Sequence, residues 1–179
     1  MGHKHSSTEI IAGALAVARS EGIGQVTYGR VAKQLGIRDR TVVYYFPKKE
    51  DLILAVMQQI GAEMQALLAE AFSSTAKDHL ELCRTAWPIL ANANTDPLFS
   101  LFFEGVGLAA AGREPFKSQI PMMMQAWVTW VMDFLEGDEK YRLEQAELTV
   151  AVLDGLILYR QTAGIEAADR VAKTMGILD

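Results

Sequence analysis

Hydrophobic residues recur every three or four positions along most of this chain, which is the spacing of one face of an α-helix. The first such stretch follows Ser6, which forms a capping-box pattern with Glu9. It stops before Gly22, a residue type common just past a helix end. The pattern therefore predicts a first helix that ends near Glu21 and has on one face Ile11, Ala14, Leu15 and Ala18.

Two short helices are predicted next. Thr27 is a favourable N-cap for a helix over Tyr28–Leu35, which Gly36 closes. The second spans Asp39–Tyr45 and stops at Phe46-Pro47. Two short helices joined by a tight glycine turn, with a helix in front, are typical of a helix-turn-helix, in which the second helix of the pair is the recognition helix.

The rest of the chain also has helical spacing. A long amphipathic helix starts at Lys48, and further helices are expected at about 77–93, 97–111, 116–135, 141–162 and 166–176. Pro88 and Pro121 fall within two of these segments and mark either a kink or a helix start. Strand-like alternation is absent from the sequence. We therefore predict an all-α fold, with a three-helix head over 1–50 joined by the long helix to a helical body over 51–179.

The charge is divided between these two parts. Residues 1–50 contain eight Lys or Arg and four acidic residues, a net charge of +4, whereas the remainder has nine against eighteen, a net charge of −9; together they give the −5 of the chain. A basic head on an acidic body is expected when only the head meets a polyanion. Chance asymmetry is the alternative.

Several classes of protein are disfavoured. No run of about 18 apolar residues and no secretory signal occur, so we expect neither a membrane span nor export. The single cysteine fits a reducing cytoplasm. Cys83 and His79 are the one available Cys–His pair, and nothing marks a residue that would orient the base. His3 and His5 fit a frayed terminus better than a metal site. We expect no enzyme, cofactor or metal.

The second short helix and its flanks have polar groups suited to DNA. Arg38 and Arg40 can contact guanine or phosphate; the alternative is that both are solvated or pair with Asp39, which can itself complement the helix start. Thr41 can donate to a phosphate, contact a thymine methyl, or simply pack. At least one of Tyr44 and Tyr45 is expected to face DNA.

The start of the long helix also fits DNA. Lys48 and Lys49 oppose the helix dipole there, and a bound phosphate would reverse this penalty. Neutralisation by Glu50 and Asp51 is the alternative. Thr27 and Arg30 are further candidates for backbone contact. Because one head makes few contacts, we expect a homodimer on a palindromic double-stranded DNA operator.

These residues resemble the N-terminal domain of TetR-family transcriptional regulators. The resemblance rests on fixed spacing over some 45 positions: a capped helix ending at Gly22, Val26-Thr27, Val31-Ala32-x-x-Leu35-Gly36-Ile37, Thr41-Val42, and Tyr45-Phe46-Pro47-x-Lys49-Glu50-x-Leu52. It assigns the phosphate contact at the long helix to Lys49. Two positions depart from the family pattern: Arg38 stands where Ser or Thr is usual, and Val43 where a phosphate-contacting Tyr is usual.

Two surfaces are expected in the body. The segment from Leu148 to Tyr159 is apolar nearly all round, so one side can meet a partner subunit; the alternative is a helix central to a monomer. Together with the last helix it could form a four-helix dimer interface, as in similar proteins, through Leu148, Val152, Gly155, Tyr159, Ala168, Val171 and Met175. The resemblance also implies an effector pocket, for which the candidates are Trp87, Phe102, Phe103, Glu104, Met123, Trp127 and Trp130.

The sequence thus predicts a ligand-responsive DNA-binding regulator. Repression is the family's usual mode, with release of the operator by a small, largely apolar effector. For any single aromatic or methionine, a place in the core remains the simpler interpretation. A helical adaptor that binds only protein is the alternative function, which the basic recognition helix argues against.

Overall fold

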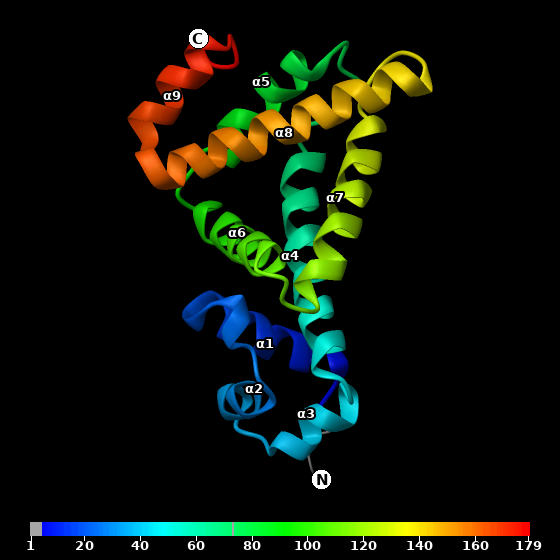
Figure 1. Ribbon diagram of the computed structural model, residues 1–179, viewed down its shortest axis with the longest axis vertical. Coiled ribbons are helices and arrows are strands. Elements are labelled where there is room, and N and C mark those ends of the chain that lie inside the picture. Colours follow the sequence, from blue (N-terminus) through cyan, green and yellow to red (C-terminus); the bar gives the residue numbers. More distant parts are fainter. Residues whose placement is uncertain (1–4, 73) are drawn as a thin grey trace. The chain divides into compact units, whose positions relative to one another are not determined.

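The computed structural model describes residues 5–72 and 74–179 (Figure 1). Over these ranges the fold is all-α, as predicted. The helices in chain order are α1 (Ser7–Glu21), the 3-10 helix η1 (Ile23–Gln25), α2 (Tyr28–Leu35), α3 (Asp39–Tyr45), α4 (Lys49–Ala69), α5 (His79–Leu90), α6 (Asp96–Ala110), α7 (Phe116–Met132), α8 (Glu139–Ala163) and α9 (Ile165–Thr174).

The helix boundaries follow the sequence signals closely. Helices α2 and α3 begin and end at the predicted residues. The helix expected over 77–93 is shorter, because the Asp78 carboxylate accepts the Glu81 N–H at 2.9 Å and so caps α5 at His79. Pro88 and Pro121 lie inside α5 and α7, so neither proline starts a helix.

The chain divides into two compact units. The N-terminal unit contains the described residues up to Glu63 together with Leu101–Ile120, and the C-terminal unit contains Met64–Ser100 with Pro121–Asp179. The division predicted from the sequence lay after residue 50, whereas this N-terminal unit also includes α4 up to Glu63, the later part of α6 and the start of α7. Helices α4, α6 and α7 each contribute residues to both units.

In the N-terminal unit, α1 packs against α2 and α3 (Figure 1). Ile10, Ala14, Val31, Val42 and Leu52 have no exposed surface and form its core, whereas Ile11, predicted for the apolar face of the first helix, is half-buried. Burying a side chain such as Val, Leu or Ile contributes about 1.5–3 kcal/mol. Helices as short as α2 and α3 are marginal alone, so this burial holds them in place.

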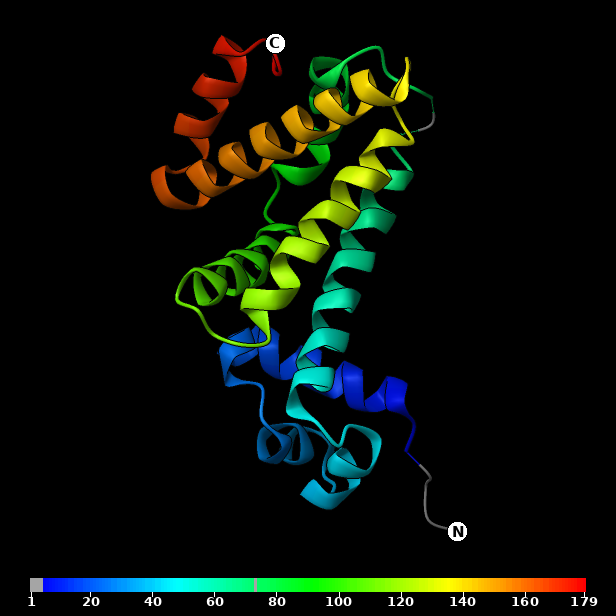
Figure 2. The same cartoon turned by 45° about the vertical axis from the view of Figure 1, so that its right-hand side comes forward.

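In the C-terminal unit, α8 packs against α5 and α9 (Figures 1 and 2). Its inner face contributes Leu153, Leu156 and Ile157 to the core, and α5 contributes Trp87, which is 2% exposed. The segment before α5 joins the segment after α7 through an isolated parallel bridge between Ala76 and Leu135. These contacts tie three segments that are distant in sequence into one body.

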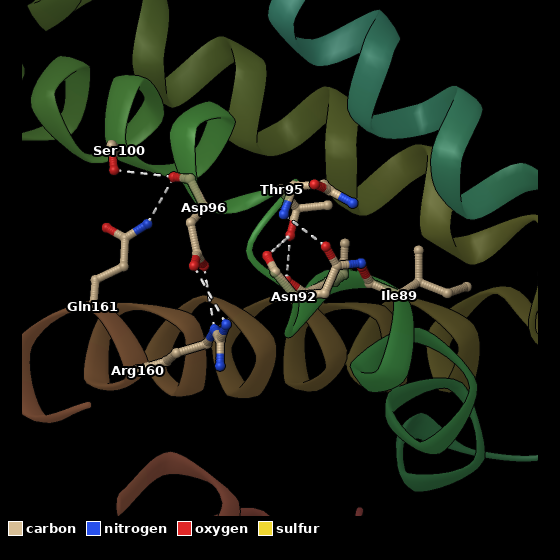
Figure 3. Close-up of polar contacts among 9 residues, drawn as sticks. Ile89, Asn92, Thr95, Asp96, Ser100, Arg160 and Gln161 are labelled. Carbon is tan, nitrogen blue, oxygen red and sulfur yellow. Dashed lines mark hydrogen bonds and ion pairs between the residues drawn. The ribbon is translucent and has the colours of Figure 1, made fainter. Parts of the chain in front are cut away.

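The start of α6 is bonded to α8 within the same unit (Figure 3). Arg160, which is 5% exposed, donates from Nε to Asp96 Oδ1 at 3.2 Å and from Nη2 to Oδ2 at 3.3 Å. Gln161 Nε2 donates to the Asp96 carbonyl at 3.1 Å. Breaking a buried ion pair is costly, because it leaves one charge unpaired.

One helix in the described ranges, α4, is long and apolar enough to cross a membrane on length and composition alone. The sequence had led us to expect no such segment, because its polar residues break every long apolar run. A core helix of a soluble protein passes the same test, and α4 has Leu52, Val56 and Ile60 buried within the chain.

Candidate nucleic-acid interface

The turn between α2 and α3 is fixed by local backbone contacts. The Thr27 hydroxyl accepts the Arg30 N–H at 3.3 Å, so α2 starts at the predicted N-cap. Gly36 adopts a φ of 65°, in the left-handed region that favours glycine. The Ile37 N–H then donates to the Ala32 carbonyl at 3.0 Å, which closes the end of α2. These contacts set where α3 begins.

Helix α3 has one buried side and one exposed side. Val42 is fully buried, whereas Arg38, Asp39, Arg40, Val43 and Tyr44 are exposed, Tyr44 to 76%. Thr41 is half-buried. Arg38 takes the N-cap position without a side-chain capping hydrogen bond, which leaves its guanidinium outside the helix cap. The predicted guanine- or phosphate-binding side chains therefore share an exposed surface with a tyrosine.

Tyr44 and Tyr45 differ in their contacts and in their exposure. The Tyr45 hydroxyl donates to the His5 carbonyl, and its ring packs edge-on against Tyr44 with centroids 5.2 Å apart. Tyr45 thus braces α3 against the start of α1, while Tyr44 is the exposed member of the pair. His3 lies outside the described residues.

Sequence reasoning missed Tyr28. Its hydroxyl donates to the Phe46 carbonyl at 2.8 Å and so joins the start of α2 to the end of α3. Burial, and then the carboxylates of Glu50 and Asp51, raise the pKa of this phenol above its usual value. The chain shows only a tyrosine after an N-cap, a position that carries no signal for a contact 18 residues away.

The cationic side chains near α3 differ in their exposure and in their hydrogen-bond and ion-pair partners. Lys48 is exposed and Lys49 half-buried at the start of α4, with Glu50 and Asp51 in the same first turn. Arg30 pairs with Glu21 at 3.2 Å and also donates to Gln25. The Thr27 hydroxyl is used by its cap. In this conformation Arg30 and Thr27 therefore have structural partners, and Lys48 is the most open of the predicted backbone contacts.

Three of the predicted pocket residues lie in the N-terminal unit, which includes Leu101–Ile120. Phe102 and Phe103 are half-buried on α6, with ring centroids 5.3 Å apart. The Glu104 carboxylate, predicted to select a polar group on a ligand, accepts the backbone N–H groups of Ile23 and Gly24 at 2.8 and 2.9 Å. In this structure the Glu104 carboxylate therefore already has two donors.

The other pocket candidates lie in the C-terminal unit. Met123, Trp127 and Trp130 are half-buried on α7, and the two indoles meet edge-on with centroids 5.2 Å apart. Trp130 also contacts Phe134 and Phe72, with centroids 4.8 and 6.0 Å away. Trp87 is instead enclosed in the core.

The Cys–His pair considered from the sequence has no catalytic geometry. His79 Nδ1 lies 2.7 Å from Gln145 Oε1, so its ring is engaged by an amide. Cys83 is fully buried, and burial raises the pKa of its thiol to about 12. A thiol with that pKa is protonated at neutral pH and is a poor nucleophile.

The residues predicted for the dimer interface are mostly exposed in the single chain. Leu148 and Tyr159 are each 44% exposed, and Gly155, Val171 and Met175 are exposed as well. Val152 is half-buried on the same side of α8. Ala168 is the exception, because it is fully buried where α9 packs on α8. Ala168 therefore contributes to the packing of α9 on α8, and its side chain is not accessible to a second subunit.

An exposed cationic recognition helix on a rigid helix-turn-helix defines a DNA-binding transcriptional regulator. Comparison with known families agrees: the sequence model described as "Bacterial regulatory proteins, tetR family" matches residues 10–56. Residues 10–56, which contain the helix-turn-helix, are therefore similar to the DNA-binding domain of that family. Regulators of this family are non-enzymatic transcription factors.

Solved structures share the fold over nearly the whole chain. A transcriptional regulator from Rhodococcus sp. Rha1 aligns with a TM-score of 0.70 at 19% identity, covering 92% of this chain and 90% of the other. A TetR transcriptional regulator from Legionella pneumophila gives 0.65 at 20%, covering 99% and 95%. The multidrug binding protein EbrR, complexed with imidazole, gives 0.69 at 21%, covering 100% and 94%. At these identities the likeness establishes the fold alone. No curated protein matches the chain.

Proposed function

We propose that this protein is a cytoplasmic, ligand-responsive repressor that binds a palindromic operator as a homodimer. The observation that carries the proposal is the exposed set Arg38, Arg40, Tyr44 and Lys48, which lies within the segment that matches the family. Arginine suits the O6 and N7 atoms of guanine, and lysine at the start of α4 suits a phosphate. Val43 offers only methyl groups, which suit a thymine methyl.

The second subunit of the proposed dimer would cover one side of α8. Leu148, Val152, Gly155 and Tyr159 recur at intervals of four, three and four residues, and therefore share one helix face. An exposed apolar stripe of this kind on a folded chain marks an interaction site. We propose that a second copy of the chain covers this face, because a palindromic operator has two half-sites and needs two DNA-binding heads.

The proposed effector would bind beside the aromatic residues of α7. Trp127 and Trp130 are half-buried, so they combine apolar surface with access from outside. Aromatic rings and Met123 suit a small, largely apolar or aromatic compound. The structural neighbour EbrR is described as a multidrug binding protein in complex with imidazole, which supports small-molecule binding by a protein of this fold.

The DNA proposal is tested by enriching a random duplex pool on the purified full-length protein. We expect two inverted half-sites, with centres about 34–36 Å apart or a multiple of this. A single half-site as the enriched sequence would overturn the homodimeric operator. Absence of enrichment even at low salt would overturn DNA binding and favour the protein-binding adaptor.

The ligand proposal is tested by screening small aromatic compounds for release of the selected duplex, measured by fluorescence anisotropy. We expect at least one to release DNA from the wild type. Trp130→Ala should still bind the duplex but respond less to that compound. A compound that saturates the protein at Trp130 and leaves operator affinity unchanged contradicts the proposed response.

A further inference from the structure

An apolar side chain, Val43, lies among the charged side chains on the exposed side of α3. Val43 follows Asp39 by four residues and Arg40 by three, so the three side chains are neighbours on the helix surface. All three are exposed, Val43 to 38%, whereas the adjacent Val42 is fully buried. The core of the N-terminal unit therefore takes one of these two valines and leaves the other on the surface.

The charges beside Val43 favour contact with base edges over contact with phosphates. The Asp39 carboxylate would be repelled by a phosphate placed against this part of α3. Arg40 can donate to the O6 and N7 atoms of guanine in the major groove. Lys48, exposed at the start of α4, is better placed in charge for the phosphates. The surface formed by Asp39, Arg40 and Val43 is therefore suited to base recognition.

The chemistry of Val43 restricts which base it can recognise. Its side chain has no hydrogen-bonding group, so it can contribute to binding only by burying its methyl groups. Because valine is branched at Cβ and stiff about χ1, these methyl groups hold fixed positions. In the major groove the C5 methyl group of thymine is the apolar group that a base pair presents. Over a C·G pair, the same valine would cover the cytosine amino group without offering it an acceptor, which is costly.

We propose that Val43 is a specificity-determining residue, which contacts the C5 methyl group of one thymine in each half-site, within two base pairs of the guanine bound by Arg40. Side chains three residues apart on a helix have Cβ atoms about 5–6 Å apart, and successive base pairs are about 3.4 Å apart. The two residues therefore reach the same base pair or near neighbours. This inference rests on the proposed DNA binding, and it specifies bases that the operator must contain.

The test uses the full-length protein and the duplex selected from the random pool. Each thymine is replaced in turn, symmetrically in both half-sites, by deoxyuridine, which lacks only the C5 methyl group and pairs with adenine in the same way. Anisotropy titration measures the affinity. At the thymine that Val43 contacts, we expect the wild type to lose about 4-fold per half-site, the value of one buried methyl group, and about 15-fold in all.

Variants of Val43 assign this loss to the side chain. Val43→Ala should bind the thymine duplex more weakly than the wild type, and should bind the thymine and deoxyuridine duplexes equally at that position. Val26→Ala is the matched control, because it removes the same groups from a fully buried site in the N-terminal unit. It lowers stability through the cavity that it leaves, but it should keep the wild-type preference for thymine.

The position of the guanine is found in the same duplex with 7-deazaguanine, which lacks the N7 acceptor. Its incorporation at the guanine that Arg40 contacts should weaken binding by the wild type and have no further effect on Arg40→Ala. That guanine should lie within two base pairs of the thymine that Val43 contacts. A larger separation would overturn the proposed arrangement, because the two side chains are neighbours on one helix.

Three further results would overturn the role of Val43. These are a selected half-site without thymine, deoxyuridine bound as tightly as thymine at every position, and a thymine preference that persists in Val43→Ala. Each leaves the proposed DNA binding intact, because a duplex has been selected. Failure to select any duplex would instead overturn the proposed function and this inference together, so the two failures are distinguishable.

Discussion

The environment of Asp154 shifts the pKa of its carboxyl group. Burial on α8 raises the pKa of its carboxyl from 3.8 to about 6. An acid whose pKa is higher in the folded state binds its proton more tightly there than in the unfolded chain. Its contribution to stability is therefore present below about pH 4 and is lost as the pH rises through 6. At neutral pH the charged form destabilises the fold.

Asp154→Asn should consequently stabilise the protein at pH 8 by about 1–2 kcal/mol, below the ~3 kcal/mol that the full shift implies, because the side chain keeps some contact with solvent. The gain should shrink steadily between pH 6 and pH 4. Urea unfolding at fixed protein concentration measures it. Asp133→Asn, at an exposed position, controls for the loss of one negative charge. A gain independent of pH would contradict the assigned cause.

For single residues, the sequence indicated which side chains are apolar or polar, but it did not indicate which groups distant in the chain they contact. Val42 could be assigned to the core, whereas the sequence left open which of Tyr44 and Tyr45 is exposed; the structure exposes Tyr44. The hydrogen-bond donors to Glu104 could not be predicted, since they lie about 80 residues earlier in the chain. Ala168 was placed in the dimer interface, yet small size fits equally well the close packing of α9 on α8, where it is found.

At the scale of elements, the helices were predicted well because their ends depend on neighbouring residues. The Ser6–Glu9 capping box, the Thr27 cap and the Gly36 turn all form as expected. The grouping of the later part of α6 with the N-terminal unit was not predictable, because apolar spacing shows that a face is buried without showing which element covers it. The same limit applies to α4, whose apolar length fits a membrane span or a core helix equally.

Gly36→Ala tests the element that positions α3. At a φ of 65° a Cβ is disfavoured by about 1–2 kcal/mol, although no atom lies within 4 Å of it. We expect a loss of stability of that size, read as a fall in Tm of roughly 2–8 °C. Gly107→Ala is the control, because it also has open space around the added Cβ and lies within α6. It should not destabilise, and an equal loss at both positions would contradict the role of the Gly36 conformation.

At the scale of the whole molecule, assembly is the main expectation beyond the single chain. Leu148→Glu would place a charge in the proposed subunit interface once per subunit, and should raise the dimer dissociation constant at least about 100-fold, equivalent to ~2.7 kcal/mol. Leu143→Glu is the control. Leu143 lies on the same helix and is 41% exposed, against 44% for Leu148, but it lies outside the proposed interface. Sedimentation at micromolar concentration should show a monomer only for the first variant. A dimer in both would place the interface elsewhere.

The division of charge links assembly to DNA binding, since a net +4 over the first 50 residues stands against −9 over the remainder. The acidic body should be repelled by DNA and the basic head attracted to it. Regulation then requires that the two parts communicate, for which α4, α6 and α7 are the helices that contribute to both units.

The most direct test of DNA recognition through α3 is the affinity of the selected duplex for Arg40→Ala and Arg113→Ala, measured by anisotropy. Both remove one exposed arginine from the N-terminal unit, but Arg113 lies outside the helix-turn-helix. Arg40→Ala should weaken binding by about 5- to 150-fold, the value of one base contact of ~1–3 kcal/mol, and Arg113→Ala by less than about two-fold. Equal losses in the two variants would show that the protein responds only to net charge, and would contradict recognition through α3.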